Sequence, residues 1–230
     1  MILKIHFPTY LPIITSNIEL ELNEDKPFMI ISGPNGCGKS TLLQLFVGLL
    51  EGNYKPTITY NEKCFYPSEN RGLVRYLPQV PENGLFSRLS VEDNIRLLND
   101  LLRLNSPDFA ADLELPKSAP AWCLSVGQQK LLLLKAIMCS LHIQKNDYSG
   151  EPIVLLLDEP FAGLDPTKKQ YACKLIMDTS INVGKRCFFI IVDHTNIKPI
   201  CLPLPCAYRK NIRDGVDFEF TIATSFELIT

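Results

Sequence analysis

The chain has 230 residues, of which 46% are hydrophobic and 21% charged, and its formal net charge is −2. This is the composition of an ordinary globular protein, and the lack of any basic run argues against nucleic acid as the main partner. No stretch stays apolar for about 18 residues, so no membrane-spanning helix is expected, and the cysteines show no CxxC pair or zinc spacing, which favours a reducing cytosol.

The first half of the chain predicts strands around a glycine-rich turn. Ile18–Leu22 alternates apolar and polar residues, as in a half-exposed strand, whereas Phe28–Ile31 is continuously apolar, as in a strand buried on both faces. The turn at 33–41 leads into a segment of helical length and spacing at 42–50. Residues 52–80, punctuated by Asn, Gly and Pro, are expected to form short strands and loops.

A helix is predicted over residues 90–104. Ser90 and Asp93 have the spacing of a capping box, in which the serine side chain accepts a backbone N–H of the first helical turn. The helix has one apolar face, as is typical of a helix packed on a core. This face comprises Ile95, Leu98, Leu101 and Leu102.

Helices and buried strands alternate in the second half of the chain. Helices are predicted over 125–143 and 167–182, and continuously apolar strands over 153–157 and 187–192. The tail alternates apolar and polar residues over 215–223, as a strand does. Strands that alternate with helices predict an α/β fold, with a largely parallel sheet covered on both faces.

The glycine-rich turn carries the residue types that bind phosphate. Lys39 in such a turn reaches the β- and γ-phosphates, the Ser40 hydroxyl ligates Mg²⁺, and backbone N–H groups at the helix start surround phosphate oxygens. A plain glycine-rich turn is the alternative. The pattern G-x-x-x-x-G-K-[ST] is matched by Gly33, Pro34, Asn35, Gly36, Cys37, Gly38, Lys39 and Ser40, with Thr41 next.

Two carboxylates, Asp158 and Glu159, follow the apolar strand at 153–157. An acid at the end of a buried parallel strand lies at the carboxyl edge of the sheet, where ligands bind. Asp158 suits the water shell of Mg²⁺. Glu159, on the other side of the pleat, suits a base that polarises an attacking water. A solvated Asp-Glu turn is the alternative.

Together these motifs resemble those of the ATP-binding cassette family of ATPases, over roughly residues 1–195 and in the family order. The fold class that this implies is α/β, with a P-loop NTPase-type mostly parallel sheet, an antiparallel β portion and a small helical lobe. The matching segments are GPNGCGKST at 33–41, Gln79 in VRYLPQ, LSVGQ at 124–128, LLLDEP at 155–160, Gly163-Leu164-Asp165, and His194 after FFIIVD.

The resemblance implies a role for each matching residue. Lys39 and Ser40 hold the phosphates and Mg²⁺, Gln79 and Asp158 complete the metal environment, Glu159 activates water, and His194 contacts the γ-phosphate. The signature residues Ser125, Val126, Gly127 and Gln128 act on the ATP of a second copy, and Asp165 lies in the loop that crosses to that copy. Tyr10 stacks on the adenine.

Each of these residues also has a plainer interpretation. Gln79 can be a loop glutamine, His194 a core-edge histidine, Tyr10 a core tyrosine and Ser125 a helix cap. The sequence departs from the family at Val126, where glycine is usual, although Ser125 and Gly127, the pair expected to face the phosphate, are intact.

The resemblance implies one domain over 1–230, with a core at 1–84 and 124–230 and a helical lobe at about 85–123. ATP and Mg²⁺ are the implied cofactors, and the implied activity is that of a transporter ATPase subunit on the cytoplasmic face of the membrane. Its partners are a second copy or a homologous ATPase subunit, in a head-to-tail dimer, and separate transmembrane permease subunits. The alternatives are a soluble cassette ATPase acting on DNA, ribosomes or assemblies, and an ATP-gated dimerisation module that hydrolyses poorly.

Overall fold

The computed structural model describes residues 1–8, 18–32, 36, 38–50, 55–69, 72–104, 106, 108–144, 151–184, 186–193, 207–211 and 219–223. The chain divides into two units. The first, here called the sheet unit, comprises Met1–Tyr76, Gly150–Glu159 and Lys185–Thr230. The second, the helical unit, comprises Leu77–Ser149 and Pro160–Gly184. The predicted single domain with a lobe at about 85–123 stays a prediction.

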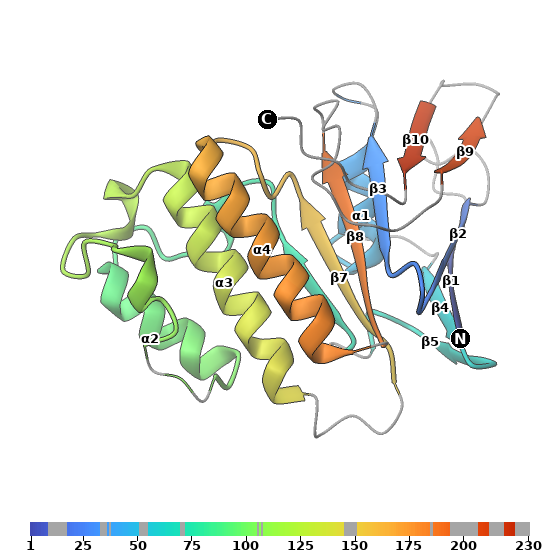
Figure 1. The fold of residues 1–230 in the computed structure, drawn as a ribbon, viewed down its shortest axis with the longest axis horizontal. Helices are drawn as coiled ribbons and strands as arrows, with labels where there is room; N and C mark the ends of the chain where they lie inside the picture. The colour runs from blue at the N-terminus through green and yellow to red at the C-terminus, as the bar shows by residue number, and fades with distance from the viewer. Residues whose placement is uncertain are drawn as a thin grey trace. The chain divides into compact units, whose positions relative to one another are not determined.

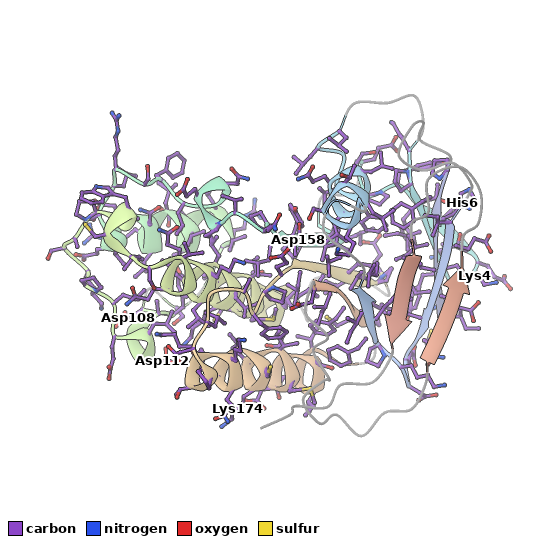
Figure 2. All side chains as sticks on the ribbon, turned by 90° about the horizontal axis from the view of Figure 1, so that it is seen from above. Lys4, His6, Asp108, Asp112, Asp158 and Lys174 are labelled. Atoms are coloured by element: carbon purple, nitrogen blue, oxygen red, sulfur yellow. The ribbon has the colours of Figure 1, made fainter. Side chains whose placement is uncertain are left out.

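The smaller sheet of the sheet unit is antiparallel. Its order is β2-β1-β4-β5, with β1 Ile2–Phe7, β2 Ile18–Asn23, β4 Thr57–Tyr60 and β5 Lys63–Phe65. Alternate residues of β1 are buried, while Lys4 and His6 face Glu21 and Glu19 of β2 on the outer side (Figure 2). The period-two pattern predicted for Ile18–Leu22 is thus confirmed.

The larger sheet has the order β6-β7-β8-β3-β10-β9. Strand β8 is parallel to both β7 and β3, and β10 is antiparallel to β3 and β9 (Figure 1). Parallel pairing places the carboxyl ends of β3, β7 and β8 at one edge of the sheet. The bounds are β3 Phe28–Ser32, β6 Val74–Leu77, β7 Ile153–Asp158, β8 Cys187–Asp193, β9 Ala207–Asn211 and β10 Glu219–Ala223.

These strands confirm the α/β fold class and most of the predicted strands. Every residue of β7 and β8 is buried, as continuous apolar runs predict. Strand β10 confirms the predicted strand at Glu219–Ala223, whereas residues 215–218 of the prediction lie outside the described residues. Strand β9 was not predicted, because Ala207–Asn211 has no clear alternation, and it is specified by its pairing with β10.

Helix α1, Lys39–Phe46, follows β3 and covers part of the sheet-unit core. It buries Leu42, Leu43, Leu45 and Phe46, and burial of a side chain such as Phe46 stabilises the fold by about 1.5–3 kcal/mol. The helix starts before the predicted segment 42–50 and ends before its last four residues. Gly48 has a φ of +74°, a left-handed conformation that stops a helix.

The helical unit is built around two long helices. Helices α3, Val126–Gln144, and α4, Pro166–Val183, run side by side (Figure 1). Leu131–Leu134 of α3 are all buried, so this helix is covered on every side there. The remaining elements are η1 Pro81–Asn83, α2 Val91–Leu101, η2 Ala111–Leu113 and η3 Ala121–Cys123. Among the described residues, no helix is both long and apolar enough to cross a bilayer.

Helix α2 confirms one prediction and corrects another. Ser90 caps it by accepting the backbone N–H of Asp93 at 3.0 Å. The predicted apolar face is wrong at Leu101, which is 69% exposed, because the buried residues of α2 all lie in its first half and Leu101 is its last residue; they are Val91, Asn94 and Ile95. The Asn94 side chain accepts from the N–H of Phe86 at 2.8 Å and donates to its carbonyl at 3.0 Å, so a buried amide fixes the preceding loop.

Candidate functional site

Asp158 lies at the carboxyl end of β7, inside the sheet unit (Figure 2). Its side chain is 0% exposed. The Ser40 hydroxyl donates to its Oδ1 at 3.1 Å, and the Tyr76 phenol donates to its Oδ2 at 3.4 Å. Two predicted metal ligands, 118 residues apart in sequence, are therefore brought into contact.

The N-terminus of α1 is arranged differently from those of α2 and α4. Gly38 precedes it with a φ of +90°, which favours glycine, and its carbonyl accepts the N–H of Leu42 at 2.9 Å. Within the described residues, α1 has no side-chain cap and no acid in its first turn, whereas Ser90 and Asp165 cap α2 and α4. An uncapped helix start of this kind is suited to bind an anion.

Glu159 does not continue the pleat of β7. Its φ is +49°, a left-handed conformation that costs a non-glycine residue about 1–2 kcal/mol, and its backbone N–H donates to the carbonyl of Val192 at 2.8 Å. The prediction that Glu159 continues the strand, with its side chain on the other side of the pleat from Asp158, is therefore wrong, because the strand ends at Asp158. Strained backbone of this kind gathers at functional sites.

The neighbouring strands end at the same edge. Ser32 of β3 is in register with Asp193 of β8, and Asp193 is buried. The predicted switch histidine, His194, comes next in the chain and lies outside the described residues. So do Tyr10 and four residues of the phosphate loop, namely Gly33, Pro34, Asn35 and Cys37.

The described donors fit a magnesium ion. No three His, Cys, Asp or Glu side chains of the described residues are placed to hold a metal by themselves. Ser40 and Asp158 nevertheless offer a hydroxyl and a carboxylate in contact with each other, and Mg²⁺ takes few protein ligands beside waters and substrate phosphates. Lys39, the first residue of α1, directly precedes Ser40 in the sequence and is buried.

Tyr76 and Gln44 belong to the same site, and sequence reasoning missed both. Burial first, and then the charge of Asp158, raises the pKa of Tyr76, whereas a hydrogen bond from Gln44 acts to lower it. Gln44 lies one helical turn after Ser40 on α1, so both face the same side. The sequence signals available were this i, i+4 spacing and the place of Tyr76 in the strand before Gln79.

In the helical unit, the signature segment begins α3 with a reciprocal cap. The Ser125 Oγ accepts the N–H of Gln128 at 3.2 Å, and the Gln128 Oε1 accepts the N–H of Ser125 at 2.9 Å. This is a capping box, and it uses an oxygen lone pair of the serine. The cap therefore leaves the hydroxyl hydrogen able to donate to a ligand.

Gly127 and Val126 differ in what surrounds them. Val126 is 54% exposed, whereas Gly127 is buried against the loop before α4. A Cβ added to Gly127 would lie 2.7 Å from the carbonyl oxygen of Gly163, closer than any carbon tolerates. Glycine is thus required at 127 by close packing within this unit, a reason that the sequence did not reveal.

The other predicted residues of this unit are also placed. Asp165 caps α4 by accepting the N–H of Lys168 at 2.9 Å, and hydrogen bonds from Lys168 lower the pKa of its carboxyl. Gln79 is exposed. Gln129, the residue after the predicted signature, is buried and donates from its amide to the carbonyl of Leu124 at 3.1 Å, which holds the start of the signature in place.

Known proteins that are similar to this chain include ATP-binding proteins of transporters. Residues 15–162 match the family described as ABC transporter. The chain is 31% identical over 166 residues to the energy-coupling factor transporter ATP-binding protein EcfA2 of Clostridium perfringens, covering 67% of this chain and 55% of that protein. It is 29% identical over 189 residues to the aliphatic sulfonates import ATP-binding protein SsuB of Bacillus cereus, covering 79% and 67%.

A solved structure shares the fold. It is that of cbiO1 from Clostridium perfringens, described as part of the ABC transporter complex cbiONQ, which is similar with a TM-score of 0.59 and 27% identity over 84% of this chain and 78% of that one. The chain spans about half the length of the first curated relatives that it matches, 55% in each case.

Proposed function

Since the chain belongs to the ABC transporter family, we propose that it is the ATP-binding and ATP-hydrolysing subunit of a transporter, dependent on Mg²⁺. The observation that carries the proposal is the Ser40–Asp158 contact beside the N-terminus of α1, where no described side chain caps the helix. Oxygen ligands for a metal ion and an anion site at one edge of a parallel sheet suit the binding of a nucleoside triphosphate.

Different residues of the chain bind the phosphates, the metal and the adenine in this proposal. The loop 33–38 and the first turn of α1 direct backbone N–H groups to the phosphates, and Lys39 adds a positive charge. Ser40 and Asp158, together with Gln79, would hold the metal. Mg²⁺ when bound supplies charge stabilisation at the β- and γ-phosphate oxygens. Tyr10, in this proposal, stacks on the adenine.

Hydrolysis requires a base near the γ-phosphate. Glu159 accepts a proton from a water whose oxygen bonds to the γ-phosphorus, while the bond from that phosphorus to the bridging oxygen breaks, giving ADP and phosphate. The left-handed backbone at Glu159 turns its side chain out of the strand, which supports a role distinct from that of Asp158. His194 stabilises the charge on the γ-phosphate.

The partners in this proposal are a second copy or a homologous ATPase subunit, and separate transmembrane permease subunits at the cytoplasmic face of the membrane. Asp165 and the signature, Ser125 to Gln128, would serve the ATP of the partner copy. The exposed side chains Phe86, Leu89 and Trp122, the last 65% exposed, support a protein-binding surface on the helical unit. Backbone bonds join their segments, since Trp122 donates to Ser87 at 3.0 Å.

The names of the relatives do not converge on one transported substrate. EcfA2 is named for an energy-coupling factor transporter and SsuB for the import of aliphatic sulfonates. We therefore propose that ATP hydrolysis is coupled to transport, and we name no transported substrate.

The test of this proposal is the variant Glu159→Gln. We expect it to bind ATP within about twofold of the wild-type affinity and to lose at least about 100-fold in turnover, because an amide accepts no proton. The matched control is Glu62→Gln, a glutamate of the same unit that is also left-handed, with a φ of +65°, but exposed. Unchanged turnover in Glu159→Gln, or no Mg²⁺-dependent turnover in the wild type, would contradict the proposal.

A further inference from the structure

Tyr76 contacts the proposed metal-binding carboxylate from a strand that carries none of the predicted site residues. It lies on β6, is half-buried, and its phenol donates to Asp158 Oδ2 at 3.4 Å. That distance is long for an O–H···O bond, so the phenol restrains the carboxylate only weakly. An ionised carboxylate only accepts hydrogen bonds, which leaves the phenol as the donor.

The two oxygens of Asp158 are thereby held from two different elements. Ser40 of α1 donates to Oδ1, and Tyr76 of β6 donates to Oδ2. Gln44, on the same face of α1 as Ser40, hydrogen-bonds the phenol in turn. Helix α1 thus reaches the carboxylate twice, directly through Ser40 and indirectly through Gln44 and Tyr76.

We propose that Tyr76 is a positioning residue that orients the Asp158 carboxylate for Mg²⁺, an inference that rests on the proposed Mg²⁺-dependent hydrolysis. A carboxylate held at one oxygen only can rotate about its Cβ–Cγ bond, and each rotation moves the oxygen that Ser40 contacts. A second donor removes that freedom. Groups that hold a metal ligand in this way set the metal affinity, whereas they touch neither nucleotide nor water.

Tyr76→Phe removes the hydroxyl and keeps the ring, which packs against the sheet-unit core. We expect the Mg²⁺ concentration for half-maximal ATP turnover to rise about 3- to 10-fold, less than the roughly 10- to 100-fold that is typical of such residues, because the bond is long. ATP affinity measured in EDTA should stay unchanged, since the phenol touches no phosphate-binding group.

A second readout does not depend on turnover. In the Glu159→Gln background, Mn²⁺ binding in the presence of ATP is measured by electron paramagnetic resonance. Tyr76→Phe should weaken this Mn²⁺ binding by about the same 3- to 10-fold factor. Gln44→Leu keeps the phenol but removes the hydrogen bond that the phenol accepts from Gln44. It should also weaken Mn²⁺ binding, by a smaller factor than Tyr76→Phe.

The matched control is Tyr60→Phe. Tyr60 belongs to the same unit, is buried, and its phenol donates to a carboxylate, Glu24, at 3.3 Å, away from Asp158. The Tyr60→Phe variant should leave Mn²⁺ affinity unchanged. This result would separate the orientation of Asp158 from a general loss of packing.

The outcomes distinguish this inference from the proposed function. If the wild type binds Mn²⁺ with ATP and Tyr76→Phe binds it equally well, the positioning role is overturned while the proposed function stands. An equal loss of metal-free ATP affinity in Tyr76→Phe would also overturn it, in favour of a packing role. If the wild type shows no Mn²⁺ binding with ATP, the metal site itself is wrong and both fail.

Discussion

Ser125 shows how one side chain can serve both the fold and the proposed chemistry. Its oxygen completes the capping box with Gln128, and its hydroxyl hydrogen stays able to donate. The plain helix-cap interpretation is confirmed, and the role toward a phosphate remains a prediction. A variant that keeps the cap and removes the donor separates the two.

Ser125→Asp is that variant, because aspartate is as good a helix cap as serine. We expect its melting temperature to stay close to that of the wild type, while ATP turnover falls at least about 10-fold, since the phosphate loses a donor and meets a negative charge. Ser125→Ala should lower stability by about 1 kcal/mol through loss of the cap. Wild-type turnover in Ser125→Asp would reduce Ser125 to a helix cap.

Site residues could be predicted where they belong to a short sequence motif. Ser40 and Asp158 were found because each follows a buried strand in a recognisable pattern, and the structure brings them together. Tyr76 could not be found in this way, because its role arises from a contact with a residue 82 positions away. The backbone of Glu159 and the packing of Gly127 depend on neighbours that no local pattern specifies.

At the scale of elements, the helical unit contains a charged cluster that links three of them. Lys135 of α3 forms an ion pair with Asp112 of η2, and Tyr171 of α4 donates to the same carboxylate at 2.8 Å. The Lys135 nitrogen also lies 5.6 Å from the centre of the Tyr171 ring. Asp112 thus connects the short helix to both long ones.

The pKa shifts of this pair give the sign of its pH dependence. Burial acts to raise the pKa of Asp112, but hydrogen bonds from Lys135 and Tyr171 outweigh it and lower the pKa below 3.8. Its contribution is therefore present above that value and is lost as the pH falls through the lowered pKa. Burial acts to lower the pKa of Lys135, but Asp112 raises it above 10.5, so that contribution is lost only as the pH rises beyond this.

Asp112→Asn should therefore lower the free energy of unfolding at pH 7 by about 1 kcal/mol, a value that allows for solvent screening of the half-exposed carboxylate. The difference from the wild type should shrink as the pH falls below 3.8 and disappear below the lowered pKa of the native Asp112 carboxyl, where that group is protonated. Urea unfolding at the two pH values measures it. The control is Asp108→Asn, because Asp108 (labelled in Figure 2) pairs with Lys117 and both of these side chains are exposed. An equal effect of the two variants at pH 7 would contradict a structural role of the cluster.

Elements could be predicted better than their ends and faces. The helices and buried strands of the second half lie within one or two residues of their predicted bounds, because long apolar runs leave few alternatives. Helix α2 shows the limit. Its spacing placed Leu101 on the core face, but Leu101 is the last residue of the helix and is exposed, whereas the first half is buried and includes an amide, Asn94, that an apolar pattern does not predict.

For the molecule as a whole, the fold class could be predicted because strands and helices alternate along the chain, and the comparisons agree with it. The strand β9 and the division into two units depend on long-range contacts and could not. The site itself is divided. The phosphate loop and Asp158 belong to the sheet unit, whereas Ser125 belongs to the helical unit. In the proposed head-to-tail dimer, one copy provides the first part and its partner the second.

The measurement that tests this central claim most directly compares two arrangements of the same two substitutions in tagged heterodimers. In the first, one subunit carries Lys39→Ala and its partner Ser125→Asp, so one composite site has both changes and the other has neither. In the second, one subunit carries both changes and its partner is wild type, so each site has one. We predict roughly half of the wild-type turnover in the first arrangement and almost none in the second, since either change alone disables a site. The reverse result, with turnover only in the second arrangement, would show that each chain hydrolyses ATP with its own Ser125 and would contradict the account.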